Sequence, residues 1–202
     1  MKLRSVLKPV QASVLRTGIG TYRLEVDDSR VDCAVFEKAL REGRCSLSQG
    51  RTQEALEKLQ TALRLWRGSA ALADVRDIVE LEAEGVRFDE LRMQAEELTI
   101  EASLAEGRAV EVIPDLFRLT VVHPFRERFV YQLMLALAMS GRLAEALDVY
   151  VHARRRFIDQ LGMEPPRELM LLHSEILRNE GNRGVLRRYG SGGLHPRQAL
   201  VT

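Results

Sequence analysis

The sequence is poor in cysteine and in aromatic residues (5%), and it has no long apolar run. Its two cysteines, Cys33 and Cys45, have neither a second pair nor a nearby histidine, so we predict no zinc site and no disulfide framework but ordinary, partly buried thiols. No stretch approaches the roughly 18 to 20 consecutive apolar residues of a membrane span. The first residues lead into no apolar signal core. We therefore expect a cytoplasmic protein without a membrane partner.

Catalytic and cofactor motifs are also lacking. Neither a zinc-protease, a nucleophile-elbow nor a P-loop pattern occurs, and the four histidines are isolated in the sequence: His123, His152, His173 and His195. Gly18-Ile19-Gly20 begins like a dinucleotide fingerprint, but the third glycine is missing and a strand is predicted to follow. We predict no catalytic residue, no metal and no cofactor. A helical enzyme is the minor alternative, since distant side chains can converge in space.

Charge is segregated along the chain. The 202 residues sum to +1, yet residues 1–26 carry +4 and residues 183–202 carry +4, which leaves −7 for the segment between them. The middle is rich in Leu, Ala, Glu and Arg, residues that favour helices. A basic head and tail therefore flank an acidic helical body, and the ends are the expected place for a polyanion.

A phrase similar to Gly-Arg-x-x-Glu-Ala-Leu recurs three times, in residues 50–56, 107–113 and 141–147. The second and third copies lie 34 residues apart, the period of a tetratricopeptide helix pair, whereas the first and second lie 57 apart. Glycine suits a left-handed helix end, and a small alanine lets two helices approach closely. The alternative is that any helix pair can be joined in this way.

Periodicity predicts a β-hairpin over residues 14–26 and only helices from residue 31 onward. The expected helices cover about 32–50, 52–66, 75–106, 108–120, 124–139, 142–161 and 165–179. Val79 and Val86 are assigned to the apolar side of the longest helix. Pro114 is expected to kink or restart the fourth helix.

Several ordered phrases carry a specific resemblance. They are Gly50-Arg51 with Ala55-Leu56, Ala62-Leu63-x2-Trp66-Arg67-Gly68, Glu90-Leu91-Arg92, His123-Pro124-Phe125-Arg126-Glu127-Arg128, Gly141-Arg142-x2-Glu145-Ala146-Leu147 and Leu161-Gly162-x-Glu164-Pro165. Through these phrases, the tract 31–177 resembles the bacterial transcriptional activator domain of SARP-type regulators. Those proteins are actinobacterial activators of antibiotic and secondary-metabolite gene clusters.

The resemblance implies a domain organisation. In the family, a winged helix-turn-helix domain binds DNA, and a tetratricopeptide-like activator domain behind it supports dimer contacts and meets the transcription machinery. Residues 1–28 resemble the end of the winged domain, namely the last turns of its recognition helix and the wing hairpin. Residues 29–180 would be the activator domain and residues 181–202 a basic disordered tail. The leading strands and first helices of the winged domain are absent, so weak, salt-sensitive DNA binding is expected.

Two groups of site residues follow from the resemblance. Phosphate or minor-groove contacts are expected from Lys2, Arg4, Lys8, Arg16, Thr17, Tyr22 and Arg23, with an ordinary solvated basic surface as the alternative. Partner contacts are expected from Phe125, Arg126 and Arg128, with tight packing at a repeat junction as the alternative.

The fold class expected is all-α, a tetratricopeptide-like helical repeat array with a short N-terminal β-hairpin remnant of a winged helix. The function expected is that of a DNA-binding SARP-type activator of a biosynthetic gene cluster, in a shortened form. Its partners would be promoter DNA, RNA polymerase and a second copy of the chain. The alternative function is an interaction module that binds or sequesters a partner regulator without touching DNA.

Overall fold

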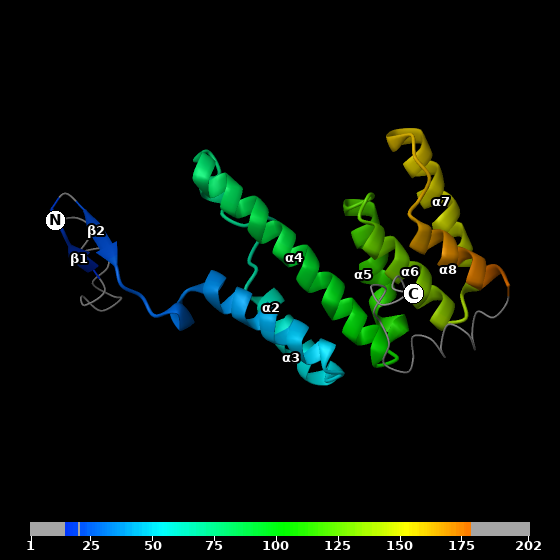
Figure 1. Ribbon diagram of the computed structural model, residues 1–202, viewed down its shortest axis with the longest axis horizontal. Helices are drawn as coiled ribbons and strands as arrows, with labels where there is room; N and C mark the ends of the chain where they lie inside the picture. Colours follow the sequence, from blue (N-terminus) through cyan, green and yellow to red (C-terminus); the bar gives the residue numbers. More distant parts are fainter. Residues whose placement is uncertain (1–14, 20, 179–202) are drawn as a thin grey trace, which may run out of the picture.

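A computed structural model describes residues 15–19 and 21–178 and shows a helical array preceded by a two-stranded hairpin (Figure 1). The all-α fold class predicted from the sequence is confirmed. The elements are β1 (Leu15–Thr17), β2 (Tyr22–Leu24), η3 (Asp28–Arg30), α2 (Asp32–Ser48), α3 (Thr52–Arg64), η4 (Ala73–Val75), α4 (Val79–Ala105), α5 (Ala109–Val122), α6 (Glu127–Met139), α7 (Leu143–Leu161) and α8 (Arg167–Leu177). None of these helices is both long and apolar enough to cross a membrane.

The recurring Gly-Arg phrase forms the same turn each time. Gly50, Gly107 and Gly141 adopt φ of 74°, 74° and 76°, the left-handed conformation in which glycine avoids the Cβ penalty. The N–H of each glycine donates to the carbonyl three residues back, and the N–H of the following arginine donates to the carbonyl five residues back. This pair of bonds is the Schellman arrangement, which satisfies carbonyls left free at a helix end. The turns join α2 to α3, α4 to α5 and α6 to α7.

Two apolar cores lie along the array, and α4 contributes to both. Phe36 and Leu40 of α2 pack with Leu59 of α3 and Ala95 of α4 in the first core. The second core begins at the C-terminal end of α4, with Leu104, and is completed by buried residues of α5, α6, α7 and α8. Because one continuous helix belongs to both cores, α4 fixes the first helix pair relative to the rest of the array.

The most enclosed element is α6. Every residue from Phe129 to Ala138 is buried, and the helix packs against α5, α7 and α8 and also contacts α4. Gln132 is the one polar side chain in this run; its Nε2 donates to the carbonyl of Glu97 at 2.8 Å. Helix α6 therefore forms the centre of the C-terminal half of the molecule.

Some sequence expectations are wrong in detail. The longest helix begins at Val79 and not near residue 75, and its first turn projects past α2 and α3, which leaves Val79 exposed (Figure 1). Val86 is exposed because it faces away from α2, which its neighbour Phe88 contacts through Phe36. Helix α5 continues through Pro114, so the restart is wrong, whereas the kink stays a prediction. The two cysteines are free and exposed, not partly buried: Cys45 lies on the side of α2 opposite the core residue Phe36. The predicted tail 181–202 lies outside the described residues.

Candidate interaction sites

The hairpin places two of the predicted DNA-binding arginines side by side. Arg16 of β1 pairs with Arg23 of β2 in the antiparallel register, so both side chains project from the same face. Both are exposed. The Arg16 Nε lies 2.6 Å from Oε2 of Glu25, which offsets part of the repulsion between the two cations. No ion pair between Arg23 and another described residue is present, which leaves its charge available to a polyanion.

The other predicted DNA-binding residues are less informative. The backbones of Thr17 and Tyr22 face each other in the hairpin register. Lys2, Arg4 and Lys8 lie outside the residues that the structure describes. The DNA-binding assignment of all seven residues therefore stays a prediction.

The predicted partner-binding residues lie at the junction between α4 and the start of α6. Arg126 forms a bidentate pair with Glu90, with Nη1 to Oε2 at 2.7 Å and Nη2 to Oε1 at 2.9 Å, and its Nε donates to Glu97 Oε1 at 2.5 Å. Arg128 donates to Glu101 Oε2 at 2.6 Å. The three carboxylates lie on one face of α4, at positions i, i+7 and i+11.

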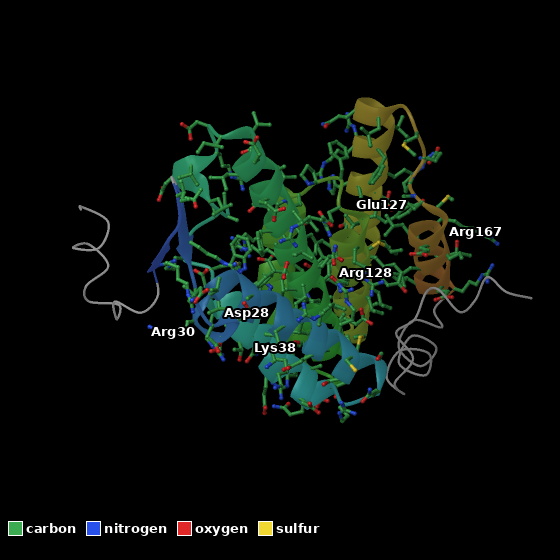
Figure 2. The ribbon with its side chains drawn as sticks, turned by 60° about the vertical axis from the view of Figure 1, so that its left-hand side comes forward. Asp28, Arg30, Lys38, Glu127, Arg128 and Arg167 are labelled. Atoms are coloured by element: carbon green, nitrogen blue, oxygen red, sulfur yellow. The ribbon has the colours of Figure 1, made fainter. Side chains whose placement is uncertain are left out.

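Aromatic contacts extend this junction to α7. The ring of Phe125 meets Phe157 edge-on, with centroids 6.0 Å apart, and Arg156 Nη1 donates to the carbonyl of Pro124 at 3.4 Å. The guanidinium of Arg128 lies 5.9 Å from the ring centroid of Tyr131. The start of α6, with Arg128 and its neighbour Glu127, is labelled in Figure 2. The His123–Arg128 segment thus connects α4, α6 and α7.

The ion pairs change the acidity of the groups involved. Hydrogen bonding to Arg126 lowers the pKa of Glu90, and hydrogen bonds to Glu90 and Glu97 raise the pKa of Arg126. The pKa of Glu127 is raised, first by burial and then by the nearby carboxylate of Glu168. The first two groups are held in their charged forms by each other, so Arg126 functions as a structural cation in the unbound chain.

A shallow cavity of about 590 Å³ follows the same junction and is lined by Glu90, Glu97 and residues 122–128. Arg126 and Arg128 are only about a quarter exposed, because their charges are already engaged by α4. Packing at the repeat junction, the alternative raised from the sequence, accounts for these contacts. A partner role for Phe125, Arg126 and Arg128 stays a prediction.

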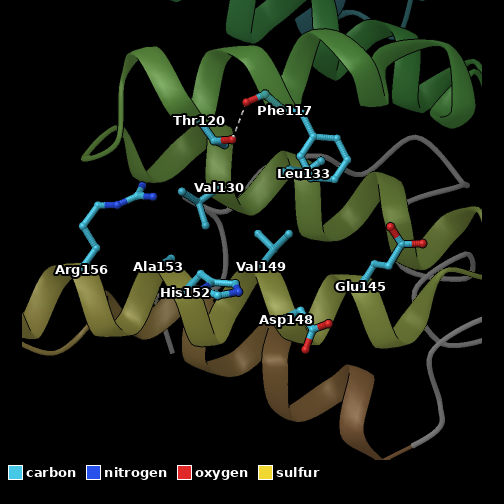
Figure 3. A pocket seen from close by; sticks show the side chains of 10 residues that line it. All are labelled: Phe117, Thr120, Val130, Leu133, Glu145, Asp148, Val149, His152, Ala153 and Arg156. Carbon is cyan, nitrogen blue, oxygen red and sulfur yellow. Dashed lines mark hydrogen bonds between the residues drawn. The ribbon is translucent and has the colours of Figure 1, made fainter.

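A second concave surface was missed by the sequence analysis. A groove of about 280 Å³ runs between α5 and α7 over α6 (Figure 3). Phe117 forms its edge on α5, Val130 and Leu133 of α6 form the floor, and Val149 and Ala153 of α7 form the other wall. The sequence shows apolar residues, valines among them, on more than one face of α5. Which of them stay exposed depends on the helices that cover each face, and the sequence does not show those neighbours. Among the described residues, no cluster of three His, Cys, Asp or Glu side chains is positioned to hold a metal ion.

Comparison with known families decides the classification. The model of the family described as "Bacterial transcriptional activator domain" matches residues 31–177, which is most of the chain. The chain belongs to this family. The match contains all three Gly-Arg turns and the α4–α6 junction, so the activator domain is the helical body from α2 to α8.

Relatives of this activator domain are regulators. The chain is 37% identical to the regulatory protein DnrI of Streptomyces peucetius, over 82% of this chain and 60% of DnrI. It is 38% identical to the transcriptional regulator RedD of Streptomyces coelicolor, over 81% of this chain and 46% of RedD. Mycobacterium tuberculosis EmbR, solved in complex with a low affinity phosphopeptide, superposes with a TM-score of 0.82 at 32% identity, covering 94% of this chain and 51% of EmbR. This chain thus spans about half to three fifths of the length of these relatives.

Proposed function

We propose that this chain is a non-enzymatic SARP-type transcriptional regulator that acts in the cytoplasm on promoter DNA of a biosynthetic gene cluster. The supporting observation is the match of the activator-domain family over residues 31–177, together with relatives that are named regulators. In this proposal the helical body contacts RNA polymerase. The segment before α2 supplies the DNA contacts, and two copies act together.

The hairpin gives this proposal its electrostatic basis. Arg16 and Arg23 lie on one exposed face, where they can contact neighbouring phosphates. Phosphate contacts position a protein on DNA, whereas sequence is read by side chains that reach the base edges. The proposed division of roles is that residues 1–28 bind DNA, residues 29–180 act on the transcription machinery, and the basic segment 181–202 is a tail.

The test is transcription in vitro with purified RNA polymerase of the source bacterium. Genomic fragments retained by the 202-residue chain would be sequenced, and the promoters among them used as run-off templates. A chain-dependent rise in transcript from those promoters supports the proposal. Failure to retain promoter fragments, or retention without a rise in transcript, would contradict it. A chain that retains no DNA at all would instead be an interaction module that binds a partner regulator.

A further inference from the structure

The groove between α5 and α7 is apolar inside and has room for only a few side chains. Val130 and Leu133 of α6 form its floor and are each 1% exposed, while Phe117 and Val149 form walls that solvent reaches. Its volume of about 280 Å³ lies below the roughly 300 to 1,000 Å³ of sites for drug-sized ligands. The groove therefore fits the side chains of a peptide segment better than a small molecule.

The two ends of the groove differ in charge. Glu145 and Asp148 of α7 line one end, and Arg156 lines the other (Figure 3). Glu145 pairs with Arg142, with Oε2 to Nη2 at 2.6 Å. No ion pair joins Asp148 to another described residue, so this end keeps a net negative charge. An occupant with basic side chains beside apolar ones would match the groove, with its basic part at the acidic end.

Helix α8 ends beside this acidic end. A connection of five residues, 162–166, turns the chain back after α7, so α8 runs antiparallel to α7 and packs on it. Tyr150 of α7 stacks on His173 of α8, with ring centroids 4.0 Å apart. Leu177 lies about one turn beyond His173 and is therefore level with about Ala146. The orange ribbon of α8 accordingly runs below α7 toward the acidic end of the groove (Figure 3).

The sequence after α8 has the composition that the groove requires. Residues 183–189 have the sequence Arg-Gly-Val-Leu-Arg-Arg-Tyr, with three arginines, three apolar or aromatic side chains and no acid. The chain from Arg178 to Arg183 can span up to about 17 Å, whereas the diameter of a helix is about 10–12 Å. Residues 183–189, here called the basic-apolar segment, can therefore reach across α7 from the end of α8.

We propose that the basic-apolar segment docks in the α5–α7 groove of its own chain. In this arrangement its arginines lie against Asp148 and Glu145, and Val185, Leu186 and Tyr189 fill the apolar part. A tethered segment has an effective concentration on the order of millimolar, so a weak intrinsic affinity is sufficient. The docked arginines contact α7 in place of a polyanion. The inference does not depend on whether the chain binds DNA.

Limited proteolysis of the full 202-residue chain tests the docking. Chymotrypsin cleaves after Tyr189, inside the segment, and after Leu194, beyond it, and mass spectrometry gives both rates. A synthetic peptide of residues 179–202 supplies the unprotected rate of each bond. Because a docked bond is cleaved only when the contact opens, Tyr189 should be cleaved about tenfold more slowly in the chain than in the peptide. Leu194 should be cleaved at nearly the same rate in both.

The concentration dependence distinguishes the chain's own groove from that of a second copy. The protection of Tyr189 should be the same at every chain concentration, because the docking is intramolecular. Protection that increases with concentration would assign the groove to the tail of another copy and would overturn the proposal.

Two groove variants have matched controls. Asp148→Arg and Phe117→Ser should each raise the cleavage rate at Tyr189 to nearly that of the peptide, because one repels the arginines and the other removes an apolar wall. Asp115→Arg and Val121→Ser should leave the rate unchanged, since both residues are exposed on α5 and neither lines the groove. Circular dichroism would verify that each variant is folded.

A charge exchange tests the contact itself. The double variant Arg187→Asp with Arg188→Asp should lose the protection of Tyr189, and adding Asp148→Arg should restore part of it. Equal cleavage of Tyr189 in the chain and the peptide would overturn the proposal. So would protection that D148R and F117S leave unchanged, or a charge exchange that restores nothing.

Discussion

Arg126 forms a bidentate ion pair with Glu90 across the junction between α6 and α4. The geometry is planar and two-pronged, which a lysine cannot reproduce. We expect Arg126→Gln to lower the free energy of unfolding by about 1–3 kcal/mol, because Glu97 then lies partly buried without its charged partner. Arg126→Lys should recover only part of the loss. Urea unfolding measures both.

Arg142→Gln is the matched control for this variant. The Arg142–Glu145 pair has similar bond lengths, 2.6 and 2.7 Å, but it lies within one turn at the helix surface. Exposed pairs of this kind contribute little, so its urea midpoint should hardly change. Equal effects at Arg126 and Arg142 would show that the junction does not depend on its ion pairs.

The junction should make stability depend on pH in the acid range. The pKa of Glu90 is lowered in the folded chain relative to its ordinary value of 4.5. Its contribution is therefore complete above the unfolded pKa and is lost as the pH falls through the lower folded value. Glu90→Gln should destabilise the chain near neutral pH, and the difference from wild type should shrink below about pH 4.5. A difference that stays constant with pH would contradict the assignment.

Replacement by alanine should have opposite effects on stability at Gly141, which lies in a Schellman turn, and at Gly68, which does not. Gly141 has a φ of 76°, in the left-handed region, whereas the φ of Gly68 lies outside that region. A Cβ added at either glycine would meet nothing within 4 Å. Gly141→Ala should therefore cost about 1–2 kcal/mol through backbone strain alone. Gly68→Ala should be neutral or stabilising because it restricts the unfolded chain. Thermal unfolding of the two variants gives the comparison directly.

The hairpin arginines should contribute unequally to DNA binding. Arg16 shares its charge with Glu25, whereas Arg23 has no such partner among the described residues. Arg23→Ala should reduce the slope of log affinity against log salt by about 0.9, the value of one phosphate contact, and Arg16→Ala by less. Glu25→Gln should strengthen binding. Equal salt slopes for all three variants and the wild type would show that the hairpin does not contact DNA.

Much of the fold is predictable because it depends on local signals. Gly50, Gly107 and Gly141 stand at helix ends where the chain adopts a left-handed conformation, so their recurrence identified the three turns. The inner faces also followed from spacing: Phe36 and Leu40 are buried as periodicity indicates. These signals are read within one or two helical turns, and tertiary contacts do not alter them.

The remaining features depend on neighbours that are distant in the sequence. Val86 has the spacing of a core residue, yet it is 54% exposed, because its neighbours on α4 make the contacts: Gly85 is buried and Phe88 packs against Phe36 of α2. Arg126 was predicted as a partner contact because the sequence does not show that Glu90 and Glu97, 36 and 29 residues away, lie against it. The groove beside Phe117 likewise arises only from the placement of α5 relative to α7.

We propose that this chain is a regulator that recognises promoter DNA. The most direct measurement is a salt titration of its binding to a duplex with paired direct repeats, with a scrambled duplex of equal length as the control. We predict a preference for the repeats that persists near physiological salt. Equal binding to both duplexes that vanishes as salt rises, or no binding to either, would contradict it.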